Sequence, residues 1–73
     1  MKRQLTAIIE KENNLFVSLC PELDIASQGL SVEEAKKNLK EALELFFVTA
    51  SEEEINQRFH NEVYITQLEV AVG

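Results

Sequence analysis

The chain has 73 residues, 13 acidic and 7 basic side chains and a formal net charge of -6, so we expect a single domain (residues 1–73) with a barely sufficient core. The acidic balance argues against direct nucleic-acid binding by this chain and favours a basic protein partner. The single cysteine, Cys20, excludes an internal disulfide, and the single histidine, His60, lacks the neighbours that a metal site requires.

Targeting and membrane signals are absent from the sequence pattern. No apolar run has the length of a membrane span, and the N-terminal residues alternate instead of forming a signal-peptide core. We therefore expect a cytoplasmic protein with no membrane partner, cofactor or metal. Because a chain this short needs extra stabilisation, we also expect a homo-oligomer, either a dimer or a larger assembly.

The first third of the chain predicts three strands. Apolar residues alternate over residues 4–10, and residues 11–14 supply a polar turn before a second, antiparallel strand at residues 15–20. That second strand is apolar at both parities, so both of its faces should be covered. Pro21 ends it because proline has no N–H to donate, and a third strand follows at residues 24–28.

A long amphipathic helix is predicted next. Ser31 and Glu34 form a capping box, and an apolar stripe continues from there to about Val48. Ser51 and the acidic turn after it predict a short second helix over residues 51–59. Residues 62–72 are rich in strand formers, although their apolar parity changes midway, which requires a bulge or burial on both faces. The stripe consists of Val32, Ala35, Leu39, Ala42, Leu43, Phe46 and Phe47.

These elements predict an α+β fold of order β-β-β-α-β. A right-handed crossover through the long helix places the fourth strand beside the first, which gives a mixed four-stranded sheet of order 3-2-1-4 with the helix on one face. One helix covers only one face of such a sheet. The other face would be covered by another copy, another protein or the short second helix.

The polar residues indicate binding more than catalysis. His60 and Cys20 have no neighbours typical of a catalytic base or an activated thiol, and the acids of residues 52–54 suit a helix N-terminus, so we assign no catalytic residue. Four acids flank the first hairpin and the proline turn, where partner recognition and solubility are equal interpretations. These candidate partner-binding residues are Glu10, Glu12, Glu22 and Asp24.

Several segments together resemble the HicB-like antitoxin family of type II toxin-antitoxin systems, in its HicB N-terminal-type domain. They are Cys20-Pro21-Glu22-Leu23, Ser27-Gln28-Gly29, Ser31-Val32-Glu33-Glu34-Ala35, Asn38-Leu39, Ala42 and Leu68-Glu69-Val70. The resemblance implies a partial ribonuclease-H-like fold. It also implies an antitoxin that neutralises a small basic ribonuclease toxin, HicA-like, by covering its active site. The alternative is a solitary oligomeric HicB-fold binding or regulatory module without a toxin partner.

Two departures from the family bear on activity. Many relatives carry a C-terminal helix-turn-helix or ribbon-helix-helix segment, whereas this chain continues only to Gly73 after its last predicted strand, so we do not expect direct DNA binding. The first strand presents Thr6, Ala7 and Ile8 where a nuclease would need metal-binding acids, so we do not expect an enzyme.

Overall fold

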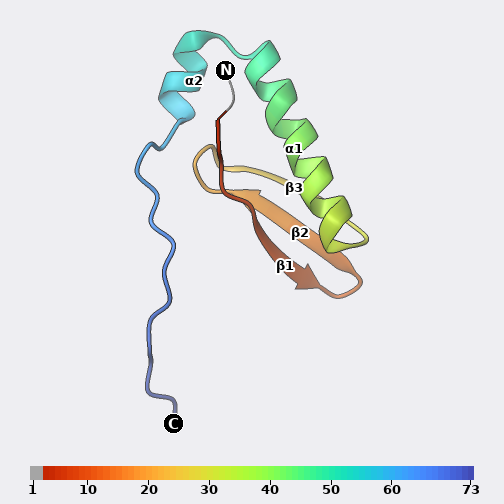
Figure 1. Ribbon diagram of the computed structural model, residues 1–73, viewed down its shortest axis with the longest axis vertical. Helices are drawn as coiled ribbons and strands as arrows, with labels where there is room; N and C mark the ends of the chain where they lie inside the picture. Colours follow the sequence, from red (N-terminus) through yellow and green to blue (C-terminus); the bar gives the residue numbers. More distant parts are fainter. Residues whose placement is uncertain (1–2) are drawn as a thin grey trace.

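An antiparallel sheet of three strands occupies the first part of the chain. In the computed structural model, which describes residues 3–73, the strands are β1 (Ile8–Glu12), β2 (Leu15–Cys20) and β3 (Ile25–Gly29). They lie in the order β1-β2-β3, and α1 (Val32–Thr49) crosses one face of the sheet (Figure 1). A short helix, α2 (Glu52–Arg58), follows.

The turns between the strands use residues that tolerate a left-handed backbone. Asn13, in the turn between β1 and β2, has a φ of 54°, and Asp24, just before β3, has a φ of 55°. Asparagine and aspartate adopt this conformation more readily than other non-glycine residues. Gly29 is required for another reason: a Cβ there would lie 2.6 Å from the backbone nitrogen of Ala35. The end of β3 therefore packs so closely against the start of α1 that no side chain fits between the two backbones.

Both predicted helix caps are confirmed. The Ser31 Oγ accepts a hydrogen bond from the Glu34 N–H at 3.0 Å, while the Glu34 carboxylate accepts from the Leu30 N–H at 2.8 Å. At α2, the Ser51 Oγ accepts from the Glu54 N–H at 3.2 Å. These bonds satisfy amides that the first turn of a helix leaves without partners.

The core lies between α1 and the sheet. Four apolar residues are fully or almost fully buried, and they are Cys20, Leu23, Ala35 and Leu39. The buried Ser18 hydroxyl donates to the Ala35 carbonyl oxygen at 2.9 Å, which removes the cost of burying it. Around this centre pack Leu5, Ile25, Leu43, Phe46, Phe47 and Phe59. The predicted stripe is thus confirmed in its central part, whereas Val32 at the helix start is 49% exposed.

The predicted mixed four-stranded sheet of order 3-2-1-4, the partial ribonuclease-H-like arrangement, is wrong. The sheet has three strands, all antiparallel, and residues 61–73 form no strand. They run as an extended segment away from the sheet, which we call the arm (Figure 1). The arm has apolar residues at both odd and even positions, so as a strand it would need both of its faces buried. The single helix α1 covers only one face of the sheet and cannot bury both.

The first strand is also shorter at its start than predicted. The pairing of Ile8 with Leu19 begins the ladder, so a residue at position 6 would face Pro21. Proline offers no N–H to a neighbouring strand, and the backbone of residues 3–7 therefore continues unpaired before β1.

Candidate partner-binding surface

The sheet face turned away from α1 carries both apolar and acidic side chains. Ser18 points at α1, and side chains alternate along a strand while paired residues share a face. The neighbours of Ser18 along β2 and their partners in β1 therefore face the opposite way. We call this the open face, and its residues in these two strands are Ile8, Glu10, Glu12, Leu15, Val17 and Leu19.

Two of the predicted acids belong to the open face. Glu10 lies opposite Val17 and Glu12 lies opposite Leu15, and both acidic side chains are exposed. Ile8, Val17 and Leu19 beside them are half-buried. A rigid strand thus holds two carboxylates along the border of an apolar patch, an arrangement suited to a partner with basic groups around an apolar contact.

Glu22 is engaged inside the protein. Its carboxylate accepts two hydrogen bonds of 3.1 Å from the Thr6 N–H and one of 2.6 Å from the Thr6 hydroxyl. Burial favours a raised pKa for this group, but the hydrogen bonds from Thr6 outweigh it and lower the pKa of Glu22. The side chain therefore fastens the N-terminal segment to the proline turn, a role that no sequence pattern indicated.

A basic side chain covers the same turn. The Arg58 guanidinium donates to the carbonyl oxygens of Leu23 at 3.1 Å and Asp24 at 3.2 Å, and it lies 5.4 Å from the centre of the Phe46 ring. The backbone N–H of His60 donates to the Glu22 carbonyl oxygen at 2.7 Å. Arg58 thus places a positive charge at the backbone of the exposed Asp24, so the proline turn carries a basic group as well as its acids.

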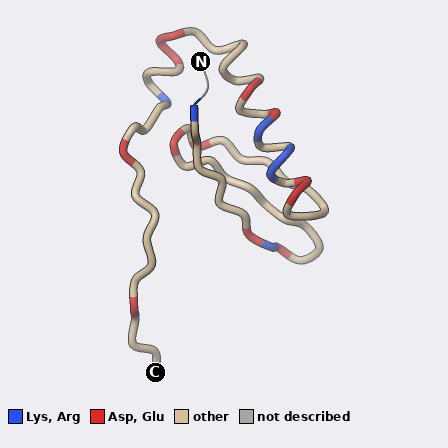
Figure 2. The backbone as a smooth tube through the Cα atoms, in the orientation of Figure 1, with Lys and Arg blue, Asp and Glu red and all other residues tan. Residues whose placement is uncertain are grey.

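The four predicted acids form two separate pairs. Glu10 and Glu12 lie at the hairpin end of β2, whereas Glu22 and Asp24 lie at its other end (Figure 2). The six residues of β2 span about 20 Å at the usual rise of a strand. Of the two pairs, only Glu10 and Glu12 adjoin the open face.

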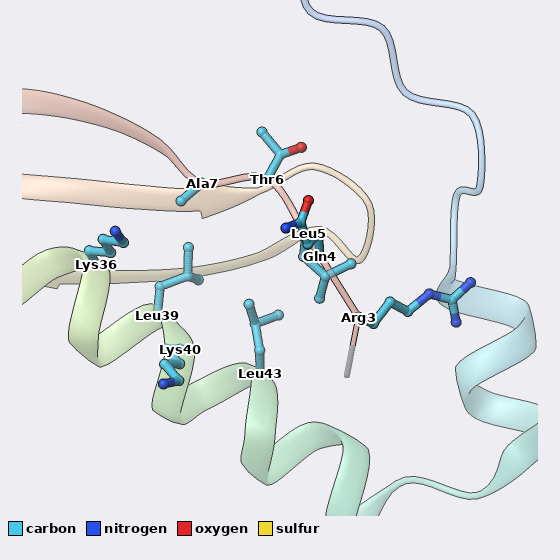
Figure 3. A pocket seen from close by; sticks show the side chains of 9 residues that line it. All are labelled: Arg3, Gln4, Leu5, Thr6, Ala7, Lys36, Leu39, Lys40 and Leu43. Carbon is cyan, nitrogen blue, oxygen red and sulfur yellow. The ribbon is translucent and has the colours of Figure 1, made fainter. Parts of the chain in front are cut away.

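A groove separates the N-terminal segment from α1. Its volume is about 430 Å³, and its apolar lining comes from Leu5 and Ala7 on one side and Leu39 and Leu43 on the other. Figure 3 shows the two α1 leucines pointing toward the N-terminal segment. The polar lining consists of Arg3, Gln4, Thr6, Lys36 and Lys40. No sequence pattern marked this groove, because it forms between residues 3–7 and α1, two segments that are distant in the sequence.

A comparison of sequences places the chain among known proteins. It is 35% identical over 68 residues to a UPF0150 protein of Helicobacter pylori (strain J99), an alignment that covers 92% of this chain and 94% of the relative. The chain belongs to the UPF0150 family. No protein-family model matches it, and no solved structure matches it significantly.

The potentially reactive side chains of this UPF0150 chain do not form a catalytic arrangement with one another. Cys20 is fully buried, as predicted for a core residue, and burial raises the pKa of its thiol, which favours the unreactive protonated form. Its Sγ–H donates to the Glu22 carboxylate at 3.4 Å. His60 is exposed and contributes its backbone amide to the proline turn.

Residues 3–73, which the structure describes, contain neither a membrane-spanning helix nor a cluster of metal ligands. Neither helix there combines the length and the apolar character that crossing a bilayer demands. No group of three or more histidine, cysteine, aspartate or glutamate side chains in that range is arranged to hold a metal ion.

Proposed function

We propose that this protein is an antitoxin-like binding protein that neutralises a small basic ribonuclease, HicA-like, by covering its active site. Two observations support the assignment to this class. The motifs around the proline turn and the start of α1 resemble HicB-like antitoxins, and the UPF0150 family is antitoxin-related. The relative's name states no function, so the proposal rests on the surface as well.

The observation that carries the proposal is the open face with Glu10 and Glu12 along it. A protein of net charge -6 is attracted to a surface built to bind phosphates, and this attraction accelerates encounter. Once the two proteins have met, the half-buried Ile8, Val17 and Leu19 supply an apolar contact that holds them together. The enzyme in this pair would be the partner.

A second candidate is a solitary oligomeric module without a toxin. The exposed apolar arm favours it, because such a segment suits self-assembly. The two candidates differ in whether a basic ribonuclease encoded beside the gene forms a complex with this chain.

The test mixes the purified protein with that neighbouring ribonuclease and follows both association and RNA cleavage. We expect a complex at micromolar concentration and loss of cleavage. The double variant Glu10→Lys/Glu12→Lys should associate roughly tenfold more slowly at low salt, with a flatter dependence on ionic strength.

Glu41→Lys/Glu44→Lys is the matched control, because both acids are exposed on α1. Each double reversal removes two negative charges and adds two positive ones, which changes the net charge from -6 to -2. If both variants slow association equally, only net charge matters and the open face is not the binding surface. If no complex forms and cleavage continues, the antitoxin proposal is wrong.

A further inference from the structure

The arm presents an unusual amount of apolar surface. Five of its large apolar side chains are highly exposed: Tyr64 by 83%, Ile65 by 58%, Leu68 by 79%, Val70 by 63% and Val72 by 94%. Single exposed apolar residues are ordinary, but a contiguous row in an extended segment marks a site of association. Beyond Glu62 the arm is rich in strand formers, so an added strand is the form that association would take. These strand formers are Val63, Tyr64, Ile65, Thr66, Val70 and Val72.

The chain exposes more surface and is more extended than a compact monomer of its size, so the apolar surface of the arm is not buried within the chain. The accessible surface is 6285 Å², whereas a compact monomer of this mass exposes about 4,600 Å². The radius of gyration is 14.3 Å, against about 11 Å for a compact chain of this length. The excess of about 1,700 Å² exceeds the roughly 800 Å² that each partner buries in a standard protein interface.

The sheet offers a place where an additional strand fits. β1 is an edge strand, and within residues 3–73 no other strand pairs with its outer side. Edge strands expose a row of N–H and C=O groups that accept another strand. The groove lies along the N-terminal continuation of this edge, where Leu5 and Ala7 line it, because α1 packs mainly over β3 and β2.

The second half of the arm has the pattern that this place requires. Leu68, Val70 and Val72 share one face of an extended strand, while Gln67 and Glu69 share the other. A strand beside β1 would turn the three apolar side chains toward the groove and its leucines. It would turn the polar pair toward the open face, which is in contact with solvent.

The start of the arm is fixed in a direction that leads away from its own β1. The hydrogen bonds of Arg58 and His60 to the proline turn anchor the chain immediately before the arm, and from there it runs outward (Figure 1). We propose that the arm pairs with the outer edge of β1 in a second copy of this chain, and that two copies exchange their arms reciprocally. Such an exchange closes around a twofold axis and leaves the anchors in place. It is independent of any ribonuclease partner.

The first experiment measures mass by sedimentation with the full chain at low micromolar concentration. We expect twice the chain mass of 8.3 kDa. Leu68→Asp/Val70→Asp should raise the dissociation constant roughly 100-fold or more, because two apolar side chains lose their burial. Its circular dichroism should match that of the parent, since the arm contributes no helix.

Leu45→Asp/Val48→Asp is the matched control. It makes the same chemical change on α1, where these side chains are 63% and 83% exposed. This variant should remain a dimer. The proposal is overturned if the parent chain sediments at 8.3 kDa, or if the arm variant dimerises as tightly as the control.

A second measurement identifies which β1 edge the arm contacts. In a mixture of isotopically labelled and unlabelled chains, filtered nuclear Overhauser spectra should show contacts between the arm of one copy and β1 of the other. Contacts found only within one copy would overturn the exchange, as would arm contacts that appear only after the neighbouring basic ribonuclease is added.

Discussion

Replacing Leu39 with alanine should remove a large share of the stability of this protein. Leu39 is 1% exposed and lies in the centre of the core, so the substitution costs the transfer free energy of the lost atoms and leaves a cavity. Comparable substitutions lower the free energy of unfolding by 2 to 5 kcal/mol, and we expect about 3 kcal/mol because the groove beside Leu39 lets water fill part of the space. A chain of this size has only about 4 to 11 kcal/mol in total.

The assay is urea unfolding followed by circular dichroism at one fixed protein concentration. With a slope of about 1 to 1.5 kcal/mol per molar urea, the midpoint should fall by roughly 2 to 3 M. Leu45→Ala is the control, since Leu45 occupies the same helix but is 63% exposed, and it should change the free energy of unfolding by less than about 0.5 kcal/mol. Equal midpoints for the two variants would refute the assigned core.

Two further substitutions test the turn and the close approach described above. The hydrogen-bonded carboxylate of Glu22 has a lowered pKa, so its contribution to stability is present above about pH 4.3, the value in an unfolded chain, and is lost as the pH falls through the lower folded value. Glu22→Gln should therefore be less stable than the parent at pH 7, and the difference in unfolding free energy should shrink in acid; a difference independent of pH would contradict this role. Gly29→Ala should lower the free energy of unfolding by about 1 to 3 kcal/mol in the same urea assay, because its Cβ would meet backbone atoms of Glu34 and Ala35. An unchanged urea midpoint would mean that α1 moves away from β3 without cost.

Local patterns predicted the elements that depend on local chemistry. The capping side chains of Ser31 and Ser51 act within three residues, so their helices begin where the sequence indicated. Asn13 and Pro21 likewise set the limits of β2, which spans the predicted residues. The buried Leu39 followed from the period of the helix alone.

The missed features depend on contacts between distant parts of the chain. The composition of the arm predicts an extended backbone, but it does not specify an edge to pair with, and the assumed neighbour within the same chain was wrong. β1 starts late because its partner strand ends at Pro21, which is a property of the pair. Glu22 was predicted to be a surface acid because Thr6 lies 16 residues away from it.

The four acids predicted at the candidate site come from two places in the chain order, the hairpin and the proline turn, and only the hairpin pair lies on the open face. Glu10 and Glu12 project from a strand whose parity also sets the open face, so their position follows from a period of two. At the proline turn, the backbone of Asp24 accepts a hydrogen bond from Arg58, which lies 34 residues later in the chain. No local pattern contains that contact.

The proline turn joins parts of the chain that are remote in sequence. Thr6 near one end, Arg58 and His60 near the other, and the buried Leu23 between them all meet within a few residues of Glu22. Regions held by shared contacts open together in native-state fluctuations and exchange their amide hydrogens as one cooperative unit. The N-terminal segment and α2 should thus detach from the protein in a single event, while the β1-β2 hairpin and the first turns of α1, which have their own hydrogen bonds, stay folded.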